Sequence, residues 1–160
     1  MQWAADFYFM QCAIREAKRA GEQGEVPIGA VIVREGQLLG KGANEREGKQ
    51  LASQHAEMIA IEAANLKIGS WRLEDCTLYV TLEPCMMCSG GIIQSRIPRV
   101  VYGASDPKGG TVRTLYQLLE DQRFNHTVEV TSGVLETTCR MLLTSFFKQL
   151  RAQKKRLKNE

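Results

Sequence analysis

The feature that most constrains the fold is an alternation of short β-branched stretches with segments of helical periodicity. The runs Val26 to Val33, Thr77 to Leu82 and Arg99 to Tyr102 are apolar and rich in β-branched residues, which favours strands. The segments 3–20 and 56–68 instead place apolar residues three and four positions apart, which is typical of amphipathic helices. Strands that alternate with helices predict a layered α/β domain with a partly parallel sheet.

Further elements extend this alternation along the chain. Glu35-Gly36 is a turn that joins the first strand to the segment 37–42, so these two runs are expected to form a hairpin. The other expected elements are a buried helix at 85–94, a loop at 103–110, a short helix at 115–119, a strand at 127–131 and a long last helix at 135–155.

Composition places the chain among globular proteins. The 160 residues, 44% hydrophobic and 24% charged, suit a single domain over 1–160, and no repeat or linker divides them. No apolar run suits a signal peptide or a transmembrane helix, so we expect no membrane partner. The five cysteines are odd in number and too sparse for a disulfide scaffold, which predicts a reduced, cytoplasmic location.

Positive charge is concentrated at the end of the chain. The net charge is only +3, but the basic helix end at about 148–160 contains six cations and one acid. A helix end of this kind is either a solvated surface that aids solubility or a surface that attracts nucleic-acid phosphates.

Two short motifs carry the residue types of a metal site, His55-Ala56-Glu57 and Pro84-Cys85-Met86-Met87-Cys88. Cys85 and Cys88 lie on one face if they open a helix, and the positive helix end favours their thiolates. His55 and Glu57 can converge only at the start of the helix predicted from residue 56. One imidazole and two thiolates favour zinc, and three protein ligands leave the fourth position open, as in catalytic sites.

Such a zinc ion, one per chain, lowers the pKa of bound water to near neutrality. Glu57 is then the candidate that moves protons. A Cys-x-x-Cys pair alone fits a redox dithiol, a structural zinc site or no functional site about equally well. A redox dithiol leaves the His-x-Glu motif unexplained, whereas a structural site needs a fourth ligand, for which only His126, Cys12, Cys76 and Cys139 remain.

We expect Cys12, Cys76 and Cys139 to be buried as small apolar residues, and His126 to be a structural or RNA-contacting histidine.

The combination of His-x-Glu with Pro-Cys-x-x-Cys is the signature of zinc-dependent nucleobase deaminases. The segment Thr81 to Cys88 accordingly resembles the cytidine deaminase-like superfamily. A narrower resemblance, to the bacterial tRNA-specific adenosine deaminases, is carried by residues 25–31, 96–104, 106–110, 124–126, 128–130, 132–136 and 146–147.

This resemblance implies a three-layer α/β/α fold, the cytidine deaminase-like fold, with a five-stranded mixed sheet flanked by helices. It implies a homodimer that deaminates adenosine to inosine at the wobble position of tRNA, with the anticodon stem-loop as partner. Glu57 would take a proton from water, deliver it to adenine N1 and later protonate the departing ammonia.

The same resemblance assigns the substrate-binding residues. Asn44 would contact the target base, and the backbone N–H of Ala56 would face the same pocket. Asp106 and Lys108 would meet the neighbouring nucleotides. Further positions assigned to substrate are Val26, Pro84, Phe147, Lys148 and Arg151. Of the pair Phe146 and Phe147, we expect one in the core and Phe147 near the RNA.

The sequence departs from the family pattern in two places, with Leu51-Ala52-Ser53-Gln54 ahead of His55 and with Ser89-Gly90-Gly91 after Cys88. Two other functions remain open. A deaminase of a free base or nucleotide, such as guanine, cytidine or deoxycytidylate, would need no basic terminal helix. An RNA-binding module with a structural zinc would have no use for Glu57.

Overall fold

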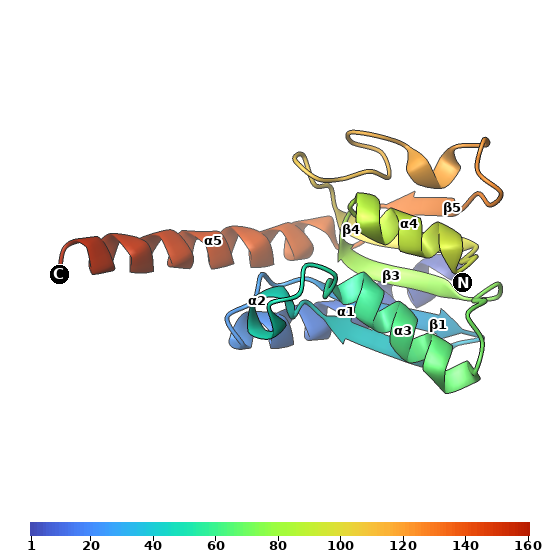
Figure 1. Ribbon diagram of the computed structural model, residues 1–160, viewed down its shortest axis with the longest axis horizontal. Helices are drawn as coiled ribbons and strands as arrows, with labels where there is room; N and C mark the ends of the chain where they lie inside the picture. The colour runs from blue at the N-terminus through green and yellow to red at the C-terminus, as the bar shows by residue number, and fades with distance from the viewer.

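The computed structural model describes residues 1–160 and contains a five-stranded mixed sheet in the order β2-β1-β3-β4-β5 (Figure 1). The first strand, β1, is antiparallel to both β2 and β3, whereas β3, β4 and β5 are parallel. This confirms the predicted sheet. The strands are β1 (Gly29–Arg34), β2 (Gln37–Ala43), β3 (Thr77–Leu82), β4 (Arg99–Ala104) and β5 (Glu129–Ser132).

Helices cover both faces of the sheet, so the predicted three layers are confirmed. The helices α3 and α4 lie on one face, and α1 with the beginning of α5 lies on the other (Figure 1). The helical elements are α1 (Gln2–Glu22), α2 (Arg46–Lys49), α3 (Ala56–Ile68), α4 (Met86–Gln94), the 3-10 turn η1 (Leu118–Glu120) and α5 (Glu136–Lys158). None of these helices combines the length and the apolar character that crossing a lipid bilayer requires.

The two apolar cores follow from the alternation of side chains along the strands. Ala30 and Ile32 of β1 belong to the core beneath α3 and α4, whereas Val31 and Val33 belong to the core beneath α1. Successive residues of a strand point to opposite faces, so β1 contributes to both layers. Cys12 and Cys139 pack in the second core and Cys76 in the first, as predicted for buried apolar residues.

The start of α3 lies close against β2 because of a glycine. A Cβ atom at Gly42 would overlap the carbonyl oxygen of Ala56, the first residue of α3. No larger residue fits there unless the helix moves. Strand β2 therefore fixes the position of the end of α3 that carries the His-x-Glu motif.

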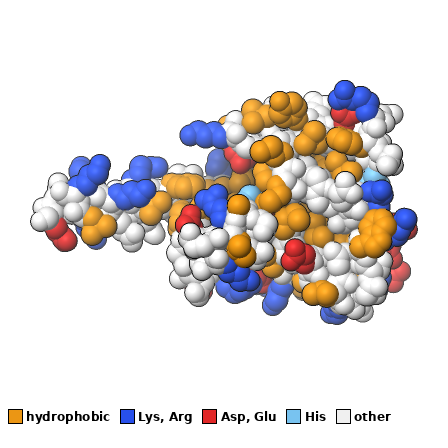
Figure 2. Space-filling model, viewed as in Figure 1, with side chains coloured by type: hydrophobic (Ala, Val, Ile, Leu, Met, Phe, Trp, Pro, Cys, Tyr) orange, Lys and Arg blue, Asp and Glu red, His pale blue; other side chains and the backbone are white.

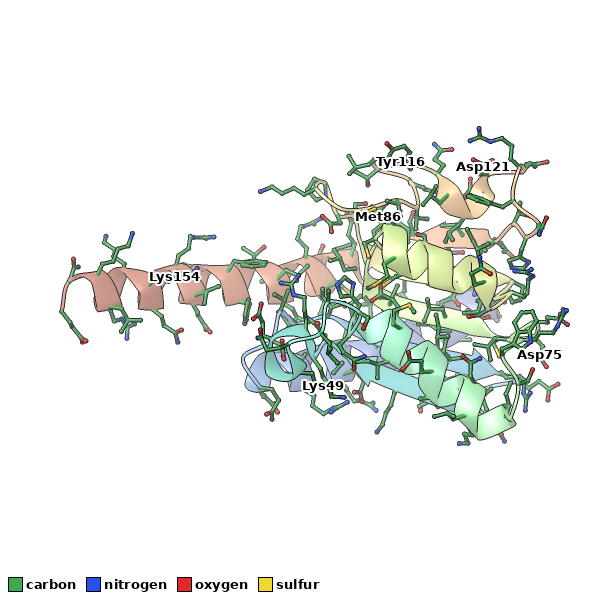
Figure 3. The ribbon with its side chains drawn as sticks, in the orientation of Figure 1. Lys49, Asp75, Met86, Tyr116, Asp121 and Lys154 are labelled. Atoms are coloured by element: carbon green, nitrogen blue, oxygen red, sulfur yellow. The ribbon has the colours of Figure 1, made fainter.

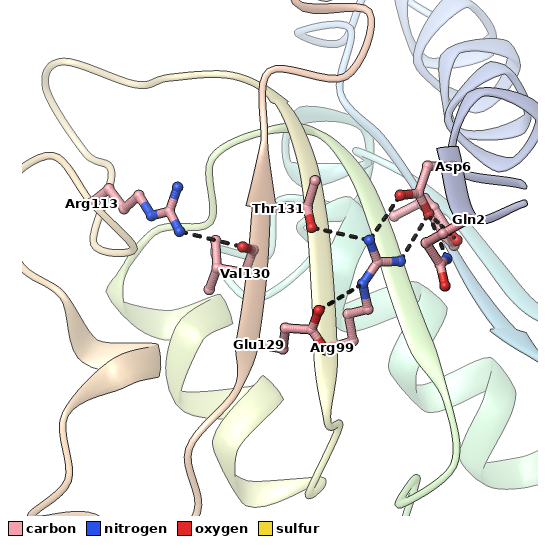
Figure 4. A network of polar contacts seen from close by, with 8 residues as sticks. Gln2, Asp6, Arg99, Arg113, Glu129, Val130 and Thr131 are labelled. Carbon is pink, nitrogen blue, oxygen red and sulfur yellow. Dashed lines mark hydrogen bonds and ion pairs between the residues drawn. The ribbon is translucent and has the colours of Figure 1, made fainter. Parts of the chain in front are cut away.

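A buried ion pair joins α1 to the other half of the sheet (Figure 4). The Arg99 guanidinium donates to both carboxylate oxygens of Asp6 at 2.8 Å and to Thr131 Oγ1 at 3.0 Å. The Tyr79 hydroxyl also donates to Asp6, at 2.8 Å. Burial alone would raise the pKa of Asp6, but the hydrogen bonds from Arg99, Tyr79 and Gln2 outweigh it and hold that pKa below its usual value.

Several element boundaries differ from those predicted. The hairpin turn is confirmed, with φ angles of 49° at Glu35 and 77° at Gly36. The first strand begins at Gly29 rather than Val26, because Pro27 has no amide hydrogen for the ladder. The expected helix at 115–119 is only the turn η1, and α5 continues to Lys158 instead of ending at 155. The four-residue helix α2 was not predicted.

Candidate active site

The two predicted metal motifs meet at the beginnings of α3 and α4. His55 is the N-cap of α3, Cys85 is the N-cap of α4, and Cys88 lies in the first turn of α4. The Nδ1 atom of His55 lies 3.6 Å from Cys85 Sγ and 3.5 Å from Cys88 Sγ. All three donor atoms lie within 4.8 Å of one another.

This spacing fits a tetrahedral metal ion. Bonds of about 2.3 Å to sulfur and about 2.0 Å to nitrogen place the two donors roughly 3.6 Å apart at a tetrahedral angle. No fourth His, Cys, Asp or Glu belongs to the group, so the protein would supply three ligands to a metal ion bound there. Two sulfur donors and one imidazole suit zinc better than a harder cation.

The charge state of Cys85 favours metal binding. A hydrogen bond from Cys88, reinforced by one from His55, lowers the pKa of Cys85 to about 4. The thiolate is the form of cysteine that binds metal. Cys85 also caps a helix at its N-terminus, where the backbone dipole attracts negative charge.

Glu57 lies beside this cluster in the first turn of α3 and is only 4% exposed. Burial raises its pKa to about 7. A carboxyl group with a pKa near the ambient pH exchanges a proton readily in both directions. The position of Glu57 therefore suits proton transfer to and from a molecule next to the metal ligands.

The cluster opens into a pocket of about 800 Å³. Its walls come from the approach to β1, the end of β2, the start of α3, the end of β3, the loop after β4 and one face of α5. The lining includes four cations, Arg46, Lys108, Arg140 and Arg151. Basic side chains also gather where α5 leaves the rest of the molecule (Figure 2). A large, open pocket with cations around it suits an anionic substrate.

Most of the predicted site residues line this one pocket. They are Val26, Asn44, His55, Ala56, Glu57, Cys85, Asp106, Lys108, Phe147 and Arg151. Cys88 is fully buried beneath it. The lining does not include Pro84, which is buried and accepts hydrogen bonds from Thr111, or Lys148, which is exposed on α5.

The two adjacent phenylalanines differ in their surroundings. Phe147 is 40% exposed and lines the pocket. Phe146 is half-buried and packs edge-to-face on Phe147, with ring centroids 5.5 Å apart. The prediction that one of the two lies in the core is wrong, because neither belongs to an apolar core. His126 is held by a hydrogen bond from its Nε2 atom to the Ile97 carbonyl oxygen at 2.7 Å, away from the metal cluster.

Sequence reasoning missed Glu83, which holds the loop between β4 and η1. Its carboxylate is 2% exposed and accepts the amide hydrogens of four loop residues, Asp106, Val112, Arg113 and Thr114. Burial would raise the pKa of Glu83, but these hydrogen bonds lower it. The only signal in the sequence is an acidic residue directly before Pro84, inside an otherwise apolar strand end.

Glu25, which sequence reasoning also missed, holds the helix α2 in place near Val26, Asn44 and Arg46 of the pocket. Its carboxylate accepts the amide hydrogens of Glu47 at 3.0 Å and Gly48 at 2.7 Å, which fixes α2. Next to it, the Asn44 side chain donates to the Val26 carbonyl oxygen at 3.3 Å and accepts the Arg46 amide at 3.2 Å. The pocket residues Val26, Asn44 and Arg46 are thereby linked.

Comparisons with known proteins agree with this geometry. The family model of the MafB19-like deaminases matches residues 4–151. A Bacillus subtilis (strain 168) protein named tRNA-specific adenosine deaminase is 53% identical over 150 residues, which cover 94% of this chain and 93% of that relative.

Two solved structures are also similar. One, from a study of A-to-I editing by tRNA:A34 deaminases at the wobble position, is 40% identical with a TM-score of 0.82, covering 85% of this chain and 99% of that one. A guanine deaminase from Bacillus subtilis is 36% identical with a TM-score of 0.59, covering 61% of this chain and 63% of that one. The chain is an enzyme that belongs to the MafB19-like deaminases, in the family of the tRNA-specific adenosine deaminases.

Proposed function

We propose that this enzyme hydrolyses adenosine to inosine at the wobble position of a tRNA anticodon, with one zinc ion held by His55, Cys85 and Cys88. The observation that carries the proposal is the meeting of this donor set with buried Glu57 at the base of a pocket with a cationic lining. When bound there, zinc would supply a water-derived nucleophile at neutral pH.

Glu57 is the residue that handles the protons of this reaction. The overall change adds water across C6, so that a C–O bond forms, the C–N bond breaks and ammonia leaves. Glu57 accepts a proton from the attacking water and passes it to adenine N1. It then accepts the remaining proton of the added hydroxyl group and donates it to the leaving amine, so that the C6 carbonyl forms as ammonia departs. Its burial beside the metal ligands keeps bulk water from competing for these protons.

Other residues of the pocket position the base. Ala56 is the first residue of α3, so its amide has no acceptor within the helix and is free for the substrate. Asn44 provides an amide side chain on the facing wall, and Val26 provides an apolar surface. An anticodon loop presents an unpaired adenosine that can be splayed into such a pocket at small cost.

The nucleotides around the target meet the rim of the pocket. Asp106 and Lys108 belong to the loop that Glu83 holds, and Phe147 and Arg151 come from α5. The aromatic ring can stack on a base, and the cations can bind phosphates. Enzymes that act on free bases need no such extended cationic rim.

The test is a comparison of substrates with the zinc-loaded, full-length protein. We expect inosine in a tRNA that carries adenosine at the wobble position, and no product from free adenosine, guanine, cytidine or deoxycytidylate. Turnover of free guanine without any reaction of the tRNA would overturn the assignment and favour a free-base deaminase with the same metal site.

We further propose that the enzyme acts in the cytoplasm as a homodimer of single-domain chains. The five cysteines are all free thiols, which suits a reducing compartment. The resemblance to the tRNA-specific adenosine deaminases supports the dimer. Light scattering of the purified protein should give twice the 17.9 kDa mass of the chain, and a mass of one chain would contradict it.

A further inference from the structure

The last helix extends well beyond the part of the molecule that it packs against. The helix α5 runs to Lys158, and every residue from Arg151 onward is exposed. In Figure 1 this end projects away from the sheet and its covering helices, and Lys154 lies on the projecting part in Figure 3. The family model ends at residue 151, so the final turns lie outside the matched range.

One face of α5 lines the active-site pocket and continues along this projection. The pocket residues Arg140, Thr144, Phe147 and Arg151 are spaced by four, three and four positions, which keeps them on one side of an α-helix. Continuing the series beyond Arg151 reaches three lysines, Lys154, Lys155 and Lys158. At 3.6 residues per turn these three lie on the same side as the pocket residues.

Arg140 pairs with Glu136 at 3.0 Å, but no acidic side chain of α5 is available to neutralise the cations that follow it. Between Glu136 at the start of α5 and Glu160 at the end of the chain there is no Asp or Glu. The opposite side of the helix after Phe147 carries Gln149, Gln153 and a single cation, Arg156. The positive charge is therefore concentrated on the side that is continuous with the pocket.

We propose that Lys154, Lys155 and Lys158, the basic arm, bind phosphates in the stem of the RNA hairpin whose loop enters the pocket. The proposal rests on the proposed function and adds a second contact region to it. Phe147 and Lys158 are separated by roughly 16 Å along the helix axis, at 1.5 Å per residue. That length would span several phosphates of one strand in a B-DNA duplex, where they are about 3.4 Å apart along the axis, so the arm is long enough to reach beyond a single phosphate of a stem.

The chemistry of the arm favours RNA over an anionic membrane. Helices that lie on membranes bury a continuous apolar face, rich in Leu, Phe or Trp, beneath their charged side. After Phe147, α5 has only Leu150 and Leu157 as large apolar residues. The arm therefore has the charge that attracts phosphates but lacks the face that inserts among lipids.

The experiment compares two single substitutions within one helical turn, Lys158→Gln on the basic arm and Arg156→Gln on the opposite side. Binding of a labelled RNA hairpin that already carries inosine at the wobble position is measured at several salt concentrations, so that no turnover occurs. Lys158→Gln should lower the slope of log K against log salt by about 1. It should also weaken binding roughly threefold to tenfold near 0.1 M salt.

Arg156→Gln also removes one positive charge, but it should leave the salt slope and the affinity for the hairpin close to those of the unmodified protein. With a hairpin of the same loop but a shortened stem, the difference between Lys158→Gln and the unmodified protein should disappear. Equal effects of the two substitutions, or no effect of Lys158→Gln, would overturn the proposal that the basic arm binds the stem. The helix end would then be only a solvated surface. Lysine-dependent binding to phosphatidylserine vesicles, without an effect on RNA, would assign the arm to membranes instead.

Failure of the basic-arm proposal can be distinguished from failure of the proposed deaminase function. Inosine formation in tRNA by the unmodified protein is measured in parallel. If inosine forms but the salt slope of Lys158→Gln is unchanged, only the arm is wrong. If no inosine forms in any tRNA, the proposed function is wrong, whatever the binding data show.

Discussion

Two buried carboxylates next to the metal cluster have opposite surroundings. Burial raises the pKa of Glu57 to about 7, whereas amide and hydroxyl donors lower the pKa of Glu83. A carboxyl group that is held ionised by several donors is a structural anchor, and one whose proton is loosely held suits acid–base chemistry. The two residues are therefore not interchangeable, although both are acidic and fully enclosed.

The first prediction concerns Glu57. The substitution Glu57→Gln keeps the shape of the side chain and all three metal ligands but removes the proton acceptor. We expect unchanged zinc content and folding, with turnover lowered by roughly 10²- to 10⁴-fold. Zinc is measured by elemental analysis and turnover by inosine formation in tRNA.

Cys88→Ala is compared with Glu57→Gln, because it removes a proposed metal ligand from a fully buried position and leaves the proton acceptor in place. Its zinc content and its thermal stability should both fall, because metal binding is coupled to folding. Near-normal turnover in Glu57→Gln would refute the assigned role, and full zinc occupancy in Cys88→Ala would refute the ligand set.

The second prediction concerns Glu83, which positions the loop 105–114 and is not assigned a contact with the reacting atoms. Glu83→Gln keeps one acceptor oxygen but replaces the other with an amino group, which would then face an amide donor, either that of Asp106 or that of Val112. Lost hydrogen bonds to a charged group should reduce the free energy of unfolding by about 1–3 kcal/mol. Amide exchange in the loop 105–114 should accelerate, and KM for tRNA should rise more than kcat falls. Unchanged loop exchange would show that Glu83 does not hold the loop.

At the scale of elements, sequence patterns located some helices and strands to the residue. The boundaries of α3 and β3 are those predicted, because helical periodicity ends at Gly69, which has the left-handed φ of 69°, and the β-branched run is short and uninterrupted. The helix α2 has no local pattern. It is fixed by Glu25, which lies more than twenty residues earlier in the chain and accepts two of its amides.

The third prediction concerns the ion pair that joins α1 to β4. In the folded protein the hydrogen bonds to Asp6 outweigh its burial and lower its pKa below the usual value, so the pair stabilises the fold at neutral pH and loses this effect as the pH falls through that lowered pKa. Asp6→Asn should cost about 3–5 kcal/mol near neutral pH, because the buried Arg99 loses its partner. The difference between the variant and the unmodified protein should shrink toward zero in acid.

Chemical denaturation at a series of pH values measures this difference directly. Tyr79→Phe is a useful control, since it removes a neutral donor to Asp6 but leaves the ion pair with Arg99 intact. Its cost should be smaller than that of Asp6→Asn. A cost of Asp6→Asn that stays the same from neutral pH down into acid would contradict the account.

At the scale of the whole molecule, the sequence predicted the three-layer fold and the convergence of the metal ligands. The spacing of the Cys-x-x-Cys pair and the junction of each motif with a helix made that convergence predictable. The part played by α5 was only partly predictable. Which of its residues face the pocket depends on how the helix packs on the sheet, so Arg140, Leu143 and Thr144 were missed while Lys148 lies outside the lining.

Hydrolysis of a wobble adenosine at the cluster of His55, Cys85 and Cys88 would place an oxygen atom from water on C6 of the base. A tRNA with adenosine at the wobble position is treated with the zinc-loaded enzyme in ¹⁸O-labelled water, and the digested RNA is analysed by mass spectrometry. We expect inosine at the wobble position alone, with its C6 oxygen carrying the label. Unlabelled inosine, or inosine at other adenosines while the wobble position stays unchanged, would rule out the proposed reaction.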